Sequence, residues 1–180
     1  MILHVATLGH PVLRRRAEAV AADAIERPLF QAFVDDLLES MHYHDGVGLA
    51  APQVFRSQRL VAAWVPAEMD EAGAGLAPAV YINPELSPLD EELEAGWEGC
   101  LSLKDLRGVV PRHRRVRLRA LDRRGRPLEL ELSGFAARVL QHEVDHLDGV
   151  VFTDRMADLS SLCFESELQR LGSAGDEDED

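Results

Sequence analysis

Hydrophobic residues follow a helical spacing in three parts of this chain. In residues 28–41 they recur at intervals of three and four, which is the pattern of an amphipathic helix that buries one face. A second helix is expected from Ser133, whose side chain can cap the first turn, to about Asp148; Gly149 suits the left-handed conformation that ends it. The segment 159–171 is again amphipathic and predicts a C-terminal helix.

Other segments have the patterns of β-strands. Residues 59–66 predict a buried strand, and shorter strands are expected at 80–83 and 92–97. In residues 115–121 arginines alternate with apolar residues, and in 128–132 leucines alternate with glutamates. We therefore expect a hairpin with one apolar face, and ion pairs between the arginines and glutamates on its exposed face.

The composition fits one globular domain. Of the 180 residues, 46% are hydrophobic and 28% are charged, and no linker or internal repeat divides the chain. We expect a domain over residues 1–171 and an acidic, disordered tail over 172–180. The net charge of -13 makes the chain a poor candidate for nucleic-acid binding. No membrane segment is expected either, because the longest uncharged apolar stretch, residues 60–67, is far short of the ~20 residues that a membrane helix needs.

The chain has only two cysteines, Cys100 and Cys163, and no visible secretory signal. Two cysteines are too few for a disulfide framework, so we expect a reducing compartment and a cytoplasmic protein. In such a compartment a thiol is free to bind a metal or to take part in catalysis. Cys163 is expected to be a packed thiol on the C-terminal helix.

The strongest chemical signal is the sequence HEVDH, which begins at His142. Residues four apart lie on the same face of a helix, so His142 and His146 can grip one metal ion. Glu143 is offset toward the same side and can act as general base on a water at the metal without binding the ion itself. Phe135 and Val139 precede the histidines on this face, which is therefore expected to point toward the core.

Two histidines leave a tetrahedral metal site one protein ligand short if the fourth position holds water. The tract that follows His146 has no histidine, and its only acids are Asp148, Asp154 and Asp158. We favour Cys100, which lies upstream in EGCLS. A lone cysteine beside apolar residues is more often a small buried hydrophobe, but the two-histidine helix reverses that expectation.

The tract GVGLAAPQ, residues 46–53, is rich in glycine and alanine. Its backbone can pass close to another group, and an extended stretch here can offer N–H and C=O groups to a peptide as an added strand. In isolation, a tight helix-to-strand turn packed by small residues is the simpler interpretation.

Together, GVGLAAPQ, EGCLS and QHEVDH resemble, in this order and spacing, the three signature motifs of the peptide deformylases. These bacterial enzymes remove the N-formyl group from nascent polypeptides. The similarity extends over nearly the whole chain, to about Arg155. We therefore expect an α+β single domain in which antiparallel strands pack around a central metal-binding HExxH helix, with further helices near the N-terminus and the C-terminus.

The resemblance also implies roles for individual residues. The implied metal ligands are Cys100, His142 and His146, the acid and base is Glu143, and the oxyanion site consists of the Gln53 side-chain amide and the Leu101 backbone N–H. The implied substrate site uses the backbone of Val47, Gly48 and Gly99 to align the peptide, and we expect Val47, Phe135 and Val139 to wall an apolar pocket for methionine.

The cofactor that the resemblance implies is one divalent metal ion per chain. In the family this is typically iron(II), although zinc and nickel also occupy the site, and thiolate and imidazole ligands suit all three. The implied substrates are N-formylmethionyl peptides, presented as nascent chains at the ribosome.

Two other functions stay open at this point. A zinc endopeptidase of the HExxH type would need a third ligand downstream of His146. A catalytically silent metal-binding protein associated with the ribosome could keep the same scaffold.

Three further features lead to weaker expectations. The family commonly has Pro-Gly or a similar turn where this chain has Lys104-Asp105, which puts the shape of the substrate rim in doubt. Asp145 is expected to pair with Arg112 and so orient the helix. Arg138 is placed either at the rim of the pocket or on the surface.

Overall fold

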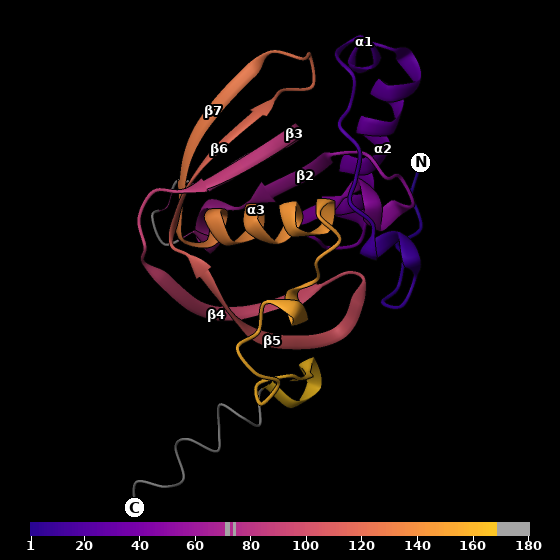
Figure 1. The fold of residues 1–180 in the computed structure, drawn as a ribbon. Coiled ribbons are helices and arrows are strands. Elements are labelled where there is room, and N and C mark those ends of the chain that lie inside the picture. The colour runs from indigo at the N-terminus through magenta and orange to yellow at the C-terminus, as the bar shows by residue number, and fades with distance from the viewer. Residues whose placement is uncertain (71–72, 74, 169–180) are drawn as a thin grey trace, which may run out of the picture.

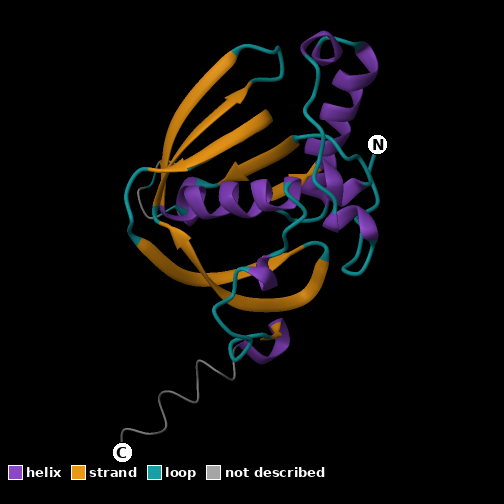
Figure 2. Cartoon of the chain, in the orientation of Figure 1, coloured by secondary structure: helices purple, strands orange, loops and turns teal. Residues whose placement is uncertain are grey.

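The computed structural model describes residues 1–70, 73 and 75–168. Helices and strands both contribute to the fold (Figure 2). The labelled α-helices are α1 (Ala22–Ile25), α2 (Pro28–Tyr43) and α3 (Gly134–Leu147), and residues 165–168 are also helical. The strands are β1 (Gly48–Ala50), β2 (Leu60–Val65), β3 (Leu76–Pro88), β4 (Leu93–Cys100), β5 (Leu103–His113), β6 (Arg115–Leu121), β7 (Pro127–Ser133) and β8 (Cys163–Phe164).

The strands form two antiparallel sheets. The larger sheet has the order β1-β2-β3-β6-β7, and the smaller one has the order β4-β5-β8. Helix α3 runs between them and contacts strands of both sheets (Figure 1). The predicted α+β single domain with antiparallel strands is confirmed at this level.

Strand β2 is buried on both faces. Val61 and Ala63 pack into the core beneath α3. Leu60 and Ala62 point the other way and pack into the core beneath α2. A strand covered on both sides needs no polar face, which explains why residues 59–66 are almost continuously apolar.

The smaller sheet brings EGCLS next to α3. Strands β4 and β5 form a long hairpin, and Cys100 ends β4 just before the turn. Leu103, Val110 and Phe152 pack together with Cys100, so this sheet rests on the segment that follows α3.

The strands β1, β5 and β8 were not predicted. Strand β5 contains Asp105, Gly108 and Pro111, and all three residue types are depleted in strands. Asp105 has a φ of 62°, in the left-handed region that glycine favours and that Asp tolerates better than most residues. The Lys104-Asp105 departure therefore keeps a turn-like backbone inside a strand.

The prediction for the C-terminal segment is wrong in its first half. Residues 159–162 form turns, residues 163–164 form strand β8, and only residues 165–168 are helical. Cys163 therefore lies on a strand rather than a helix, and it is half-buried and free. The rest of the predicted helix and the acidic tail at 172–180 lie outside the described residues.

Helix α3 agrees with its predicted bounds but not with its predicted cap. Ser133 occupies the N-cap position, yet its side chain makes no capping hydrogen bond. Gly149 has a φ of 76°, as expected for the residue that ends the helix.

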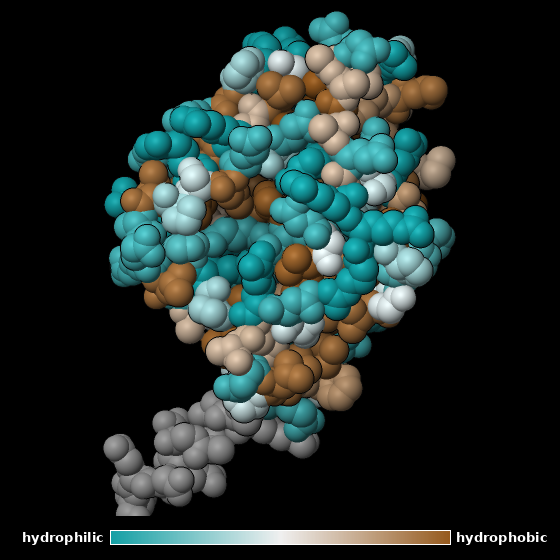
Figure 3. All heavy atoms as spheres, viewed as in Figure 1, coloured by the Kyte–Doolittle hydropathy of each residue, from teal (hydrophilic) through white to brown (hydrophobic). Residues whose placement is uncertain are grey.

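The exposed face of the β6–β7 hairpin carries the predicted ion pairs. Arg117 pairs with Glu131 at 2.8 Å, and Arg119 pairs with Glu129 at 2.7 Å. On the face drawn in Figure 3, hydrophobic residues form separate patches among hydrophilic ones. Within the described part of the chain, no helix is both long and apolar enough to cross a membrane.

Candidate metal centre and active site

Cys100, His142 and His146 come together between the smaller sheet and α3. The two imidazole rings lie one helical turn apart, with centroids separated by 5.0 Å. One potential ligand atom from each of the three residues lies within 4.8 Å of the others, and Cys100 Sγ is 3.2 Å from His146 Nε2. All three residues are buried. This is the arrangement of three protein ligands that leaves a further position open on a bound ion.

The chemistry of these donors fits a divalent transition metal. Burial alone would raise the pKa of the Cys100 thiol, but the charge of His146 and the hydrogen bond with His142 outweigh it and hold the pKa well below its ordinary value. The thiolate is the form that binds a metal. Iron, zinc and nickel all accept one thiolate and two imidazoles.

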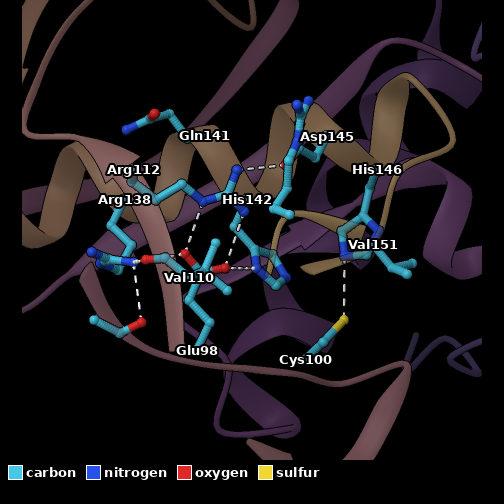
Figure 4. Close-up of polar contacts among 12 residues, drawn as sticks. Glu98, Cys100, Val110, Arg112, Arg138, Gln141, His142, Asp145, His146 and Val151 are labelled. Carbon is cyan, nitrogen blue, oxygen red and sulfur yellow. Dashed lines mark hydrogen bonds and ion pairs between the residues drawn. The ribbon is translucent and has the colours of Figure 1, made fainter. Parts of the chain in front are cut away.

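Glu98 orients His142. Its carboxylate lies 2.9 Å from His142 Nδ1, which leaves Nε2 for a metal (Figure 4). Burial would raise the pKa of Glu98, but the hydrogen bonds with His142 and Arg112 outweigh burial and lower the pKa to about 2. Glu98 is therefore ionised at neutral pH, beside the metal site.

Two buried arginines surround Glu98. Arg112 donates two hydrogen bonds to the carboxylate, at 2.9 and 3.0 Å, and Arg138 donates one at 3.0 Å. Arg112 also reaches Asp145 at 2.5 Å, which confirms the predicted pair. We call Glu98, Arg112, Arg138 and Asp145 the buried charge cluster. It connects β4 and β5 to the face of α3 that carries the histidines (Figure 4).

Arg138 is not a surface residue. It is 9% exposed, and its guanidinium also donates to the backbone oxygens of Val110 at 2.8 Å and Glu94 at 2.7 Å. A Cβ atom at Gly96 would lie 2.8 Å from this guanidinium, so only glycine leaves room for it. Arg138 nevertheless lines the cavity described below, so its position is at the wall rather than at the rim.

Glu143 is buried beside the three donors. Desolvation by burial raises the pKa of Glu143 to about 7, and its Oε2 atom has no hydrogen-bond partner among the described residues. A Cβ atom at Gly48 would overlap this carboxylate, so glycine at position 48 lets β1 approach it. A carboxyl group whose pKa is near neutral can accept a proton and give it back.

Gln53 points its amide nitrogen toward the same centre. Its Oε1 atom accepts a hydrogen bond from the Ala50 N–H at 2.8 Å, and this fixes which end of the amide is oxygen. The Nε2 atom then donates to Ser102 Oγ at 3.2 Å and lies 3.5 Å from Cys100 Sγ. An N–H donor is thus held at the metal site by its neighbours.

These groups face one open cavity of about 920 Å³. It is bordered by β1 on one side, the end of β4 on another and α3 beneath. All the residues expected at the active site line it except His146, which lies behind the others with no exposed surface. The lining ones are Val47, Gly48, Gln53, Gly99, Cys100, Leu101, Phe135, Val139, His142 and Glu143.

Comparison with known proteins identifies the chain. Residues 2–161 match the family model described as polypeptide deformylase. The chain is 40% identical to peptide deformylase 1 of Prochlorococcus marinus, over 95% of this chain and 89% of that protein. The chain belongs to the peptide deformylase family. It is therefore a metal-dependent hydrolase that removes the N-formyl group from nascent polypeptides.

Solved peptide deformylase structures agree with this fold. The enzyme of Thermotoga maritima is 39% identical, has a TM-score of 0.77, and covers 88% of this chain and 99% of its own. A class I type b peptide deformylase from Acinetobacter baumannii, solved with Met-Ala-Ser bound, is 34% identical and has a TM-score of 0.80. The match covers 87% of this chain and 99% of that chain.

The endopeptidase alternative, which would need a third metal ligand downstream of His146, is not supported. Each of the three acids in the tract 147–159, which follows His146, has another partner. Asp148 pairs with Arg59 at 2.7 Å, Asp154 pairs with Arg14, and Asp158 accepts from the Ser160 N–H at 2.7 Å.

Sequence reasoning missed two residues of the deformylase site. Glu98 stands in EGCLS, two residues before Cys100, and Ser102 stands two residues after it. A carboxylate near a metal-binding cysteine was a usable signal, because ligating histidines commonly need an acceptor for their second nitrogen. The contact of Ser102 with Gln53 joins two distant motifs and had no local signal.

Proposed function

We propose that the groups around this cavity divide the deformylation of N-formylmethionyl peptides among themselves in the way that the family resemblance implied. One observation carries the proposal. The Glu143 carboxylate, the Gln53 amide and the donors of Cys100 and His142 all face the same cavity, which β1 borders.

Cys100, His142 and His146 would hold one divalent ion, with α3 as the metal-binding helix. When bound, such an ion supplies a Lewis acid that makes water more acidic and polarises a carbonyl oxygen. Glu98 keeps the His142 ring in place by accepting its Nδ1–H.

Glu143 would move the proton. Its carboxylate accepts a proton from the attacking water and later donates it to the amine that leaves as formate is released. Gln53 Nε2 and the Leu101 backbone N–H would donate hydrogen bonds to the formyl oxygen as it gains negative charge, each contributing on the order of 3 kcal/mol to the transition state. The hydrogen bond from Ala50 holds Gln53 in the donating orientation before substrate arrives.

The substrate would lie along β1 and the end of β4. Strand β1 is the edge of the larger sheet, so the backbone of Val47 and Gly48 can pair with an extended peptide, with Gly99 on the opposite side. Val47, Phe135 and Val139 would wall the methionine pocket. The Acinetobacter baumannii relative was solved with a peptide that begins with methionine, which supports methionine as the first residue of the substrate. A formyl group carries no side chain, so a tight pocket can exclude acetylated chains by size.

Three finer proposals accompany this one. The physiological ion is iron(II), the substrates are nascent chains at the ribosome, and the protein works in the cytoplasm. Two unpaired cysteines in the described residues support a reducing compartment, and the thiolate and imidazole ligands are compatible with iron.

Replacing Glu143 by glutamine tests the mechanism with little change in shape. We expect formate release from formyl-Met-Ala-Ser by anaerobically purified protein to fall by about 10²- to 10⁴-fold, because the proton carrier is lost. The matched control is Glu131→Gln on the exposed face of β7, which should keep full activity. Metal content is measured in every sample. Undiminished release from metal-loaded Glu143→Gln would contradict the proposal.

A further inference from the structure

The mouth of the cavity is partly built by the segment that follows α3. Strand β8 pairs with β5, with Cys163 opposite Arg107 in the register. The Val109 N–H also donates to Ser161 Oγ at 3.0 Å. These contacts place Glu165 and Leu168 on the cavity lining. The family model ends at residue 161, so this part of the mouth lies beyond the family match.

Arg107 lies directly against the proposed path of the peptide. A Cβ atom at Gly99 would overlap the Arg107 guanidinium, so that group rests on the Gly99 backbone. Arg107 Nη2 donates to Glu165 Oε1 at 2.7 Å, and the two side chains are 29% and 54% exposed. A charge in this position is close to substrate and only partly screened by water.

The other charged residues of the mouth are not paired with each other. Asp45, Lys104 and Asp105 line the cavity, and none of them forms an ion pair within the described part of the chain. Arg107 is therefore held by an ion pair with a neighbouring wall of the cavity, whereas Lys104 has no such pair among the described residues.

We propose that Glu165 positions Arg107 and thereby sets the charge preference for the residue that follows formylmethionine. The proposal rests on the proposed function, because it takes the peptide to run along Gly99. An acidic side chain at the second position of a substrate can pair with Arg107 only by competing with Glu165. The wild-type mouth therefore gives acidic second residues little advantage over basic ones.

The test compares the kcat/KM values of three peptides, formyl-Met-Ala-Ser, formyl-Met-Asp-Ser and formyl-Met-Lys-Ser, at low salt. Glu165→Gln should raise the ratio of the Asp peptide to the Lys peptide by about two- to five-fold, the range for one partly exposed ion pair. The effect should shrink at 1 M salt, where the Debye length is about 3 Å. Arg107→Met should lower the ratio below that of the wild type.

The double variant separates positioning from a general structural effect. In the Arg107→Met background, Glu165→Gln should change the ratio by less than it does when Arg107 is present, because only the direct charge of Glu165 is then removed and no arginine is released. Glu131→Gln, which alters an exposed arginine–glutamate pair outside the cavity lining, should leave the ratio at the wild-type value. A change of the same size with and without Arg107 would overturn the proposal.

An unchanged ratio in Glu165→Gln, together with normal hydrolysis of formyl-Met-Ala-Ser, would overturn the charge selection and leave the proposed function standing. No formate from any of the three peptides with metal-loaded wild type would overturn the proposed function, and this proposal with it.

Discussion

Two groups of arginine–carboxylate pairs occupy opposite environments in this molecule. On the exposed face of β6 and β7, Arg117 and Arg119 face Glu129 and Glu131, and the side chains are 35–65% exposed. In the buried charge cluster, every side chain is 10% exposed or less. Both groups use the same chemistry at similar distances.

The exposed and the buried pairs differ in how much stability is lost when one partner of a pair is removed. An exposed ion pair returns to water when it is broken, so it contributes little to stability. A buried charge without its partner stays desolvated and destabilises the fold strongly. The buried charge cluster is therefore better explained by what it positions than by net stability. It holds His142 through Glu98 and orients α3 through Asp145.

Glu98→Ala should have the largest effect. It removes the acceptor of His142 and leaves Arg112 and Arg138 facing each other without a carboxylate between them. We expect a loss of about 3–5 kcal/mol in the free energy of unfolding of the metal-free protein, measured by urea titration. Metal affinity, measured by competition with a chelator, should fall about 10- to 100-fold because the orientation of His142 is lost. Stability within error of the wild type would show that the cluster is not energetically different from the exposed pairs.

Arg138→Met should have an intermediate effect. The substitution keeps much of the side-chain volume but leaves the Val110 and Glu94 oxygens without their donor. Since Arg112 still neutralises Glu98, we expect a smaller loss of about 1–3 kcal/mol in the free energy of unfolding. Arg138→Lys should be more stable than Arg138→Met, because lysine returns the positive charge but not the planar guanidinium geometry. Full recovery of stability in Arg138→Lys would argue against a role for the guanidinium geometry.

Arg119→Ala should have the smallest effect. Its partner Glu129 is already hydrated, so we expect the urea midpoint to stay within the error of the wild type. Raising the salt concentration should remove any remaining difference, whereas it should not rescue Glu98→Ala, since buried charges are poorly screened. A large loss for Arg119→Ala would break the comparison.

Helices and strands were predicted correctly where burial of one face left a regular pattern in the sequence. Helix α2 and the β6–β7 hairpin were recognised because one face of each is buried and the other is exposed. Strands β1 and β8 were missed because segments of three and two residues carry no period. Strand β5 was missed because Asp105, Gly108 and Pro111 interrupt its pattern, and only pairing with β4 makes it a strand.

The candidate site divides in the same way. His142, Glu143 and His146 could be assigned from the spacing of one helix, and Cys100 was favoured because the tract after His146 offers no histidine. Gln53 and Leu101 came only from the resemblance of separate motifs. Glu98 had a place in a quoted motif but no assigned role. The contact of Glu165 with Arg107 joins residues 58 positions apart and had no signal in the sequence.

The amino-acid sequence by itself determined the fold class, the family and the residues that can bind a metal, because these depend on residue type and local spacing. Only the tertiary structure decided which charges are buried, where Arg138 lies, and which groups share the cavity. Burial and pairing are set by segments that meet across the sheets. An arginine is a surface residue on the β6–β7 hairpin and a buried support of the metal site beside α3. The surroundings decide whether its charge is hydrated or must be paired.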